Sequence, residues 1–423
     1  MKLPVSYHQQ RMWFIDHFER DYLYEGGPIY HNIPLSFTIH KKVSTEEMYH
    51  AFIQLVRRHD ILRTKIVREG DQIFQVVTTP EDAEIIKLFK EVHHLKNNQE
   101  KIRKVSFDFE NELLLKAFFE QEEDHSRVLF VCHHALVDRY SLTILKEDFL
   151  SLINNPKEAL GFTMQYKDFS EWQQAIDPYE TEMLVTYWRE KLSNIQVLYL
   201  PTDTERVPIH IYKAATSAFS YDKDRLQSFA AIHGITAQIV SLTAYKMGLA
   251  TFSELSDIVI GTLMNMRTSL TETTVGAIEN LVVLRSVFEE NSTLSDACTV
   301  VDKTWKAAEN NKGIPFDKLV VEINPKKDMS RTALFDVLYL YDAYDVITDE
   351  QDELFEYKNQ GLGKYDLTLL VQEKENTFDF ILTYNELYFK PETIISFLQI
   401  IENILDTATQ HQDTDALRGI AVF

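Results

Sequence analysis

The chain has 423 residues and a net charge of −22, with 45% hydrophobic and 12% aromatic residues. This composition excludes a disordered chain. The length exceeds the roughly 250–300 residues that one core usually supports, so we expect two subdomains. The strong negative charge disfavours nucleic acid and anionic membranes as partners.

The two cysteines, Cys132 and Cys298, show neither metal-binding nor disulfide spacing, which is typical of a reducing compartment. The first residues, MKLPVSYHQQRMWF, lack the apolar core of a signal peptide. No apolar run reaches the length of a membrane-spanning helix. We therefore predict a cytoplasmic protein that does not enter a membrane.

Helices and strands alternate in the first part of the chain. A helix is predicted over Ser6–Arg20 and a strand over Leu35–Ile39. Ser44 and Glu47 form a capping box at the start of an amphipathic helix that ends near His59. The first helix should bury an apolar side made of Met12, Trp13, Ile15 and Phe18.

A set of cations near residue 60 is the one candidate for binding an acidic partner. It consists of Arg57, Arg58, Lys65 and Arg68, and scattered solvated charge is the simpler interpretation. Further strands are expected over Asp71–Val77 and Ala117–Phe119. The pair His93-His94 between them has no apolar run before it, so we expect it to be exposed.

The chemistry centres on the stretch SRVLFVCHHALVDRYS, residues 126–141. Val128–Cys132 predicts a buried strand, and Ser141 is expected to cap a helix from Leu142 to about Ile153. His133 and His134 therefore stand where a buried strand ends, a place that can hold an imidazole rigidly as a general base.

Three other interpretations of the histidines stay open or are weaker. Each could be a buried histidine with a purely structural role. A metal site is disfavoured because adjacent histidines point in different directions. A serine hydrolase is disfavoured because the sequence has no Gly-x-Ser-x-Gly elbow.

The second half continues the alternation of helices and strands. Helical sequence from Leu226 to about Phe252 is expected to break near Gly234. A buried strand is predicted over Asp257–Leu263. Another strand is predicted over Phe335–Tyr341, and the strands Tyr365–Val371 and Phe378–Tyr384 should pair. A last helix should run from Glu392 to about Thr409.

HHALVDRYS resembles the HHxxxDG motif of condensation domains from nonribosomal peptide synthetases, which are relatives of chloramphenicol acetyltransferase. Arg139 replaces the usual glycine and Tyr140 a common tryptophan. SYHQQRMWFID, RRHDILRTKI and QYKDFSEWQ resemble further motifs of this family, in the family's order. VGAIENLVVLRS resembles the fifth motif, although its Phe-Val-Asn core is blurred into Ala277-Ile278-Glu279-Asn280.

The resemblance implies an α/β fold: two chloramphenicol acetyltransferase-like α/β sandwich subdomains, residues 1–175 and 176–423, in a V-shaped pseudo-dimer. The HHxxxD motif belongs to the first subdomain. The acidic segment Asp349–Gly361 is expected to latch the two subdomains together, or to be a plain surface loop.

The resemblance also implies an activity. A donor acyl or peptidyl thioester and an acceptor amine arrive on phosphopantetheine arms of two carrier proteins, and an amide forms in a nonribosomal peptide or hybrid polyketide pathway, such as antibiotic synthesis. His134 is the base or positioning residue, and His133 supports it. Asp138 pairs with Arg267 and is structural. Candidate tunnel residues are Arg139, Tyr140, Ser141 and Asn280. No metal or cofactor is expected in the domain, and monomer is the expected state.

Several alternatives to this activity stay open. The acceptor could be a hydroxyl, giving an ester, or coenzyme A could carry the donor. A catalytically silent member could instead recruit a partner enzyme. The chain could be an excised domain or a free-standing protein.

Overall fold

The computed structural model describes residues 2–20, 31–81, 83–95, 97–98, 102, 104–156, 160–195, 198–208, 213–289, 294–324, 328, 330–342 and 365–410. They divide into two compact units, each with its own apolar core, as the length predicts. The expected segment Asp349–Gly361 lies outside the described residues. No described helix is long and apolar enough to cross a membrane.

The first unit contains residues 2–177 and, from later in the chain, Met266–Glu279. That later segment reaches it through Val275 and Ile278, which belong to the first unit's core. The predicted boundary after residue 175 did not include the segment Met266–Glu279 in the first unit. The elements of this unit are β1 (Lys2–Pro4), α1 (Tyr7–Glu19), β2 (Asn32–Ile39), α2 (Thr45–Arg58), the 3-10 turn Asp60–Arg63, β3 (Thr64–Glu69), β4 (Gln72–Val77), α3 (Ala83–Ile86), β5 (Phe89–Glu91), β6 (Leu115–Gln121), β7 (Ser126–His133), α5 (Arg139–Asn154) and α6 (Tyr166–Gln174).

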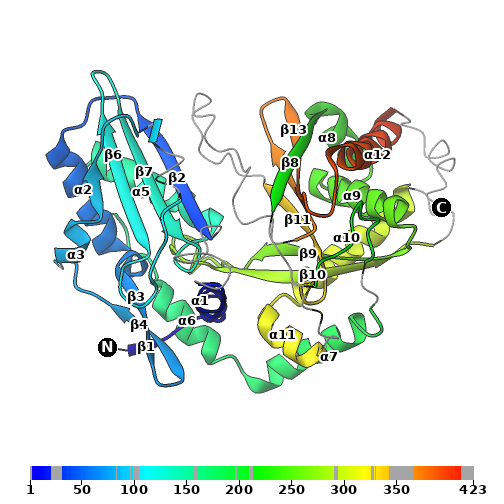
Figure 1. Cartoon of the computed structure of the whole chain (residues 1–423), viewed down its shortest axis with the longest axis horizontal. Coiled ribbons are helices and arrows are strands. Elements are labelled where there is room, and N and C mark those ends of the chain that lie inside the picture. Colours follow the sequence, from blue (N-terminus) through cyan, green and yellow to red (C-terminus); the bar gives the residue numbers. More distant parts are fainter. Residues whose placement is uncertain are drawn as a thin grey trace. The chain divides into compact units, whose positions relative to one another are not determined.

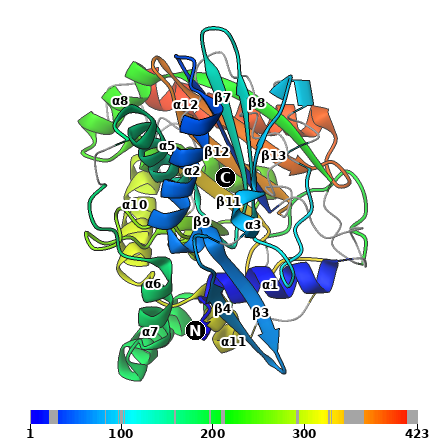
Figure 2. The ribbon, with the colours of Figure 1, turned by 90° about the vertical axis from the view of Figure 1, so that its left-hand side faces the viewer.

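Two sheets form the first unit, in the orders β2-β7-β6-β5 and β1-β4-β3. Strand β7 is central in the larger sheet and pairs antiparallel with β2 and β6. Helices α2 and α5 pack together along this sheet (Figures 1 and 2). Phe37, Phe52, Phe130 and Phe149 fill the space between helices and sheet, with aromatic ring centroids 5.5–6.2 Å apart. The strand that precedes the two histidines is therefore held on both edges and on one face.

The capping box of α2 forms as predicted, because the Ser44 hydroxyl accepts from the Glu47 amide and the Glu47 carboxylate accepts from the Ser44 amide. The predicted apolar side of α1 is wrong in part. Phe18 is 58% exposed, whereas the polar residues Gln9 and Asp16 are buried. Helix α1 thus turns an unusually polar side inward, which an amphipathic pattern cannot reveal.

The second unit holds a six-stranded sheet in the order β10-β9-β11-β12-β13-β8. Its helices include α9 and α12, which pack against each other (Figure 1). The break near Gly234 and the antiparallel pairing of β12 with β13 are confirmed. The elements are α7 (Pro178–Lys191), β8 (Ala214–Asp222), α8 (Lys223–Ile232), α9 (Ala237–Ser253), β9 (Asp257–Asn265), β10 (Glu279–Val287), α10 (Leu294–Asn310), α11 (Phe316–Ile323), β11 (Val337–Asp342), β12 (Leu367–Glu373), β13 (Thr377–Asn385) and α12 (Pro391–Gln410).

Candidate active site

The two histidines lie at the carboxyl end of β7, where the strand turns into α5. His133 is the last strand residue, opposite Asn32 of β2. The amide of His134 donates to the His31 carbonyl (2.8 Å), so β2 also fixes the first residue of the turn. The backbone at both histidines is therefore rigid, as a positioned base requires.

The His134 ring is oriented by its own turn. Nδ1 lies 2.9 Å from the Val137 carbonyl oxygen, which can only accept, so Nδ1 carries a hydrogen. In the neutral ring the lone pair is then on Nε2. The His134 side chain is 23% exposed, so Nε2 belongs to a ring that solvent-sized groups can reach. This tautomer suits a general base.

The His133 ring is buried and faces the core instead. Its Nδ1 accepts from the Ala135 amide at 3.0 Å. Its ring lies edge-on to Phe109 and Phe107, at centroid distances of 4.7 and 6.0 Å. Burial lowers the pKa of His133 to about 3, so the ring is neutral at physiological pH. These contacts give it a supporting part in the turn, and a direct role in catalysis stays a prediction.

His8 of α1 is a further imidazole at the site, and it was not among the predicted site residues. Its Nε2 donates to the His134 carbonyl at 3.0 Å, and its Nδ1 accepts from Arg11 at 3.3 Å. Burial, with the neighbouring His134 and Arg11, lowers the pKa of His8 well below its usual range. Helix α1 thus supports the backbone of the base with a neutral side chain.

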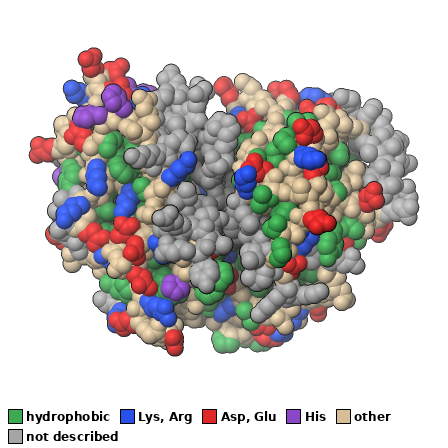
Figure 3. Space-filling model, in the orientation of Figure 1, with side chains coloured by type: hydrophobic (Ala, Val, Ile, Leu, Met, Phe, Trp, Pro, Cys, Tyr) green, Lys and Arg blue, Asp and Glu red, His purple; other side chains and the backbone are tan. Residues whose placement is uncertain are grey.

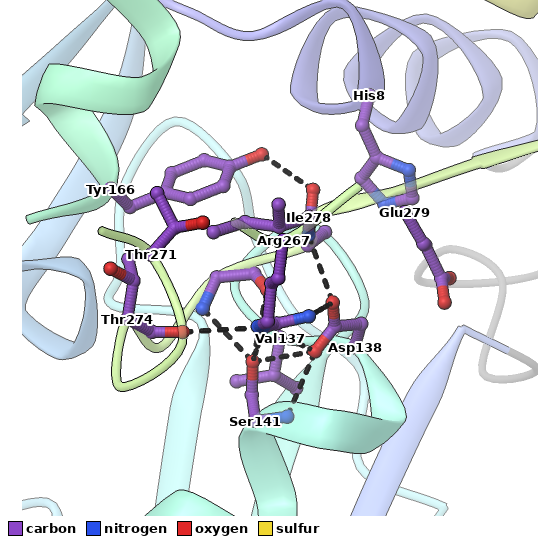
Figure 4. Close-up of polar contacts among 12 residues, drawn as sticks. His8, Val137, Asp138, Ser141, Tyr166, Arg267, Thr271, Thr274, Ile278 and Glu279 are labelled. Carbon is purple, nitrogen blue, oxygen red and sulfur yellow. Dashed lines mark hydrogen bonds and ion pairs between the residues drawn. The ribbon is translucent and has the colours of Figure 1, made fainter. Parts of the chain in front are cut away.

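Asp138 and Arg267 form a buried bidentate ion pair, with N–O distances of 2.6 and 2.9 Å (Figure 4). The two side chains are 1% and 4% exposed. Burial opposes ionisation of Asp138, but Arg267 and hydrogen bonds from Ser141 outweigh it and lower the pKa of Asp138. Asp138 also accepts from the Ile278 amide at 2.9 Å. The pair therefore ties the turn after His134 to the segment 266–279, and no proton relay through Asp138 is needed.

The expectation that Ser141 caps the helix is wrong, because α5 begins earlier and Asp138 is its cap. The Asp138 carboxylate accepts from the Ser141 amide at 2.8 Å, the usual geometry of an N-cap aspartate. The Ser141 hydroxyl is used differently: it accepts from the Gly276 amide at 2.9 Å and lies 2.7 Å from Asp138 Oδ1. This candidate tunnel residue is fully buried and joins the helix start to the loop before β10.

Gly276 packs its backbone directly against the ring of Tyr166. A Cβ atom at this position would lie 1.9 Å from Tyr166 Cδ2. The Tyr166 ring cannot move away easily, because it is 1% exposed and its hydroxyl hydrogen-bonds Ser6 and the Ala277 carbonyl. The loop therefore requires glycine at this position.

We expect Gly276→Ala to lower the free energy of unfolding by about 1–3 kcal/mol, the usual cost of overpacking a rigid site. Urea denaturation of wild type and variant measures it. Gly161→Ala is the matched control in the same unit, because a Cβ there meets no atom within 4 Å. Equal losses in the two variants would contradict this account of the loop.

The remaining candidate tunnel residues have different surroundings. Arg139 is the first residue of α5, and burial lowers its pKa to about 9, which still leaves it charged at neutral pH. The Arg267 guanidinium lies over the ring of Tyr140, and its central carbon Cζ is 4.6 Å from the centroid of that ring. Asn280 donates to the carbonyls of Lys312 and Ile314 at 2.8 and 2.6 Å. Both of its donors thus brace a loop of the second unit, and a contact with substrate stays a prediction.

Glu279 is the site residue that the sequence analysis missed. Its Oε1 lies 3.5 Å from His134 Nε2. Burial and the neighbouring Asp138 raise the pKa of Glu279 to about 8. The available signal was an acid inside the apolar run VGAIENLVVL, but an alternating strand can place such a residue on either face.

The raised pKa of Glu279 predicts a pH effect on stability. The ordinary value is 4.5, so the folded state holds the proton more tightly, and the contribution of Glu279 to stability should fall as pH rises from about 4.5 to about 8. We expect Glu279→Gln to have a melting temperature a few degrees above wild type at pH 9 and close to it at pH 5. A constant difference at all pH values would contradict this effect.

Three of the four cations near residue 60 are paired with acids, and the fourth, Arg68, lies over the Trp13 ring at 5.7 Å. Arg57 lies 3.3 Å from Glu81, Arg58 lies 2.6 Å from Asp148, and Lys65 contacts Glu84 at 2.6 Å. Figure 3 likewise shows basic and acidic side chains interspersed on the visible face. A pocket of about 740 Å³ includes Arg57, Arg58, Phe162 and Lys167 in its wall. The simpler interpretation, scattered charge, therefore describes this region.

The described side chains give little support to a metal site or to a reactive thiol. The described part of the chain holds no group of three histidine, cysteine or acidic residues placed to bind a metal ion. Burial raises the pKa of the Cys132 thiol to about 12, so it is inert. The site offers instead one oriented imidazole, a carboxyl group facing it and a buried ion pair behind it.

Comparison with known proteins gives the family. The condensation-domain family model matches residues 1–417. The chain is 30% identical over 420 residues to a plipastatin synthase protein of Bacillus subtilis (strain 168), in a match that spans 95% of this chain and 16% of that protein. It is 28% identical over 420 residues to a surfactin synthase protein of the same organism, spanning 96% and 11%. The chain thus spans less than a fifth of these two relatives.

Solved structures agree in fold. The X-domain from teicoplanin biosynthesis matches with a TM-score of 0.81 at 17% identity, over 96% of this chain and 95% of that one. The condensation domain of the monacolin K polyketide synthase matches with a TM-score of 0.80 at 16% identity, over 97% and 98%. These identities establish the fold alone. Because the family model covers nearly the whole sequence, this chain belongs to the condensation-domain family.

Proposed function

We propose that this chain forms an amide bond between a carrier-bound acyl or peptidyl thioester and an acceptor amine, with His134 as the base. The observation that carries the proposal is the tautomer of His134. Its Nδ1 is held by the Val137 carbonyl, and Nε2 keeps the lone pair in a ring that is 23% exposed. The buried Asp138–Arg267 pair holds the turn that sets this orientation.

The proposed reaction needs proximity and one proton transfer. The amine nitrogen attacks the thioester carbonyl, the C–N bond forms and the C–S bond breaks. The proton leaves the amine for Nε2 and is delivered to the thiolate sulfur, so atoms and charge balance. Two thioester arms brought together supply effective concentration, which can be the largest contribution to such a step. A base adds about 10²–10⁴-fold.

Carrier proteins with phosphopantetheine arms are the proposed partners. One relative supports this by name, a phosphinothricin tripeptide synthetase of Streptomyces viridochromogenes (26% identity, 93% of this chain and 38% of that protein). One solved structure of this fold lies in a four-domain nonribosomal peptide synthetase (TM-score 0.82, 17% identity, 99% of this chain and 34% of that one). No cofactor bound by the domain itself is proposed.

The experiment is a single-turnover assay read by intact-protein mass spectrometry. A donor-loaded carrier is mixed with an acceptor carrier bearing either an aminoacyl or a hydroxyacyl group. Acyl transfer to the aminoacyl carrier supports amide formation. Transfer to the hydroxyacyl carrier alone would replace it with ester formation. An acyl-coenzyme A donor in a parallel reaction tests whether a carrier is needed.

A catalytically silent member is the second candidate, and Arg139 favours it. The family motif has glycine there, whereas this chain places a partly buried, charged side chain within reach of Glu279. One solved relative in fold, an X-domain, is in complex with OxyB. Under this alternative wild type transfers no acyl group between cognate carriers, whichever acceptor is offered. Arg139→Gly would then be the first variant to test for restored transfer.

A further inference from the structure

Glu279 faces the reactive nitrogen of His134 and has no part in the proposed function so far. It is the first residue of β10, within the stretch that resembles the fifth family motif. Its Oε1 lies 3.5 Å from His134 Nε2, and the two side chains are 16% and 23% exposed. A carboxyl group therefore lies at the nitrogen where the base would act.

The tautomer of His134 makes this contact informative. Because Nδ1 carries a hydrogen for Val137, the neutral ring turns a lone pair toward a carboxylate oxygen that also has only lone pairs. Two such groups this close repel each other unless one proton lies on Oε1 or on Nε2. The two residues are therefore one titrating pair, whose protons belong to the pair rather than to either residue.

Other charged groups around the pair have a definite arrangement. On the side of α1 lie Arg11 and the neutral His8, and at the start of α5 lie Asp138 and Arg139. Arg267 follows β9 and is already paired with Asp138. Figure 4 draws Glu279 together with His8 and the Asp138–Arg267 pair, and Asp138 and Arg267 both act on the pKa of Glu279. Since Arg11 and Arg139 add positive charge, the Glu279 carboxylate is the group that favours a charged imidazole here.

We propose that Glu279 is a positioning residue that shares a proton with His134 and stabilises the imidazolium formed when the acceptor amine is deprotonated. This inference rests on the proposed function for its catalytic meaning. In the fully deprotonated form of the pair, the amine proton goes to Nε2 as the C–N bond forms, and the Glu279 carboxylate balances its charge until the proton passes to the thiolate as the C–S bond breaks. The working base is then the His134–Glu279 pair, in which the Glu279 carboxyl group lies on the Nε2 side of the imidazole ring.

The first test needs no substrate. Protein labelled with ¹³C at histidine Cε1 is titrated by NMR, and the His134 signal is assigned by its loss in His134→Ala. We expect that signal to titrate in two coupled steps in wild type. In Glu279→Gln we expect one step, at an apparent pKa lower by about one unit or more, since an opposite charge at this distance has that effect.

Matched variants separate charge from folding. Glu272→Gln removes an exposed carboxylate from the same segment and should leave the His134 titration unchanged. Glu279→Asp should retain most of the wild-type curve. Glu279→Val replaces the carboxyl group with an apolar side chain. It should show the same single-step His134 titration as Glu279→Gln, and it takes the place of that variant if Glu279→Gln folds poorly. Superimposable His134 curves in wild type, Gln and Val variants would overturn the proposal.

The transfer assay gives the second readout. Glu279→Gln should slow transfer by up to about tenfold at pH 7, because a base weaker by one pKa unit loses at most a factor of ten in rate, and should move the acid limb of the pH–rate profile by the shift that NMR measures. If NMR shows the coupling but wild type transfers nothing, the pairing stands and the proposed function fails. If wild type transfers through His134 but Glu279→Gln behaves like wild type, the pairing fails and the function stands.

Discussion

Replacing His134 with alanine is expected to slow amide formation about 10²–10⁴-fold while leaving the protein folded. The loss in rate follows from the position of Nε2, which is the oriented acceptor for the amine proton. The small effect on folding follows from exposure: the ring is 23% exposed, and Nδ1 binds the Val137 carbonyl within the same turn. The single-turnover assay and a melting curve measure the two effects on the same sample.

His133→Ala is the matched control, because it removes the neighbouring imidazole from a different environment. His133 is buried beside Phe107 and Phe109 and accepts from the Ala135 amide. We expect this variant to melt at a lower temperature, since a buried ring leaves a cavity and an amide without its acceptor. Wild-type transfer by His134→Ala with cognate carriers would remove His134 from the mechanism. A large drop in its melting temperature would instead show that the ring is structural.

Local patterns predicted the elements that local physics controls. The capping box of Ser44 and Glu47 and the break near Gly234 depend on residues within one or two turns, and both are confirmed. The cap of α5 was misassigned because Asp138 and Ser141 are both good caps, three residues apart, and a cap is decided by backbone geometry. The buried face of α1 was misjudged because Gln9 has a polar partner 66 positions away in Gln75, and because Asp16 pairs with Arg20 four residues on, which an apolar pattern does not register.

Sequence pattern and periodicity could not predict which distant residues meet at the site. Asp138 and Arg267 are 129 positions apart, and the resemblance to a family, not spacing, predicted that they pair. Glu279 escaped notice for the same reason: its side chain meets His134 only because Gly276 lets its loop pack against Tyr166 and the Ile278 amide binds Asp138. Such long-range register depends on the packed fold.

Replacing Arg267 with alanine should have the largest effect on folding, with a loss of about 3–5 kcal/mol in the free energy of unfolding, because it leaves a buried carboxylate without its counter-charge. Asp138 is 1% exposed, so water cannot take the place of the guanidinium. The same change leaves the carbonyls of Thr274 and Gly276 without the donor that Arg267 provides. We expect little soluble protein, and urea denaturation of the soluble fraction measures the loss.

Variants at the pair and away from it test the cause. Arg267→Lys should recover only part of the stability, since an ammonium cannot reproduce the two-pronged contact with Asp138. Lys306→Ala breaks an ion pair with Asp302 at the surface, where the lysine side chain is 67% exposed. This change should alter the free energy of unfolding little. Equal stability of Arg267→Ala and Lys306→Ala would contradict a structural role for Arg267.

The pH dependence of the Arg267→Ala deficit identifies the buried charge as its source. In wild type the pKa of Asp138 is lowered, so its contribution to stability is present above the ordinary value of 3.8 and is lost as pH falls through the folded value. Without Arg267, burial alone acts and raises the pKa of Asp138, so acid relieves the variant by protonating the carboxyl group. The difference in unfolding free energy between wild type and Arg267→Ala should therefore shrink as the pH is lowered from 7 toward 4. A difference that is independent of pH would mean that the lost packing and carbonyl contacts, and not the unpaired carboxylate, cause the instability.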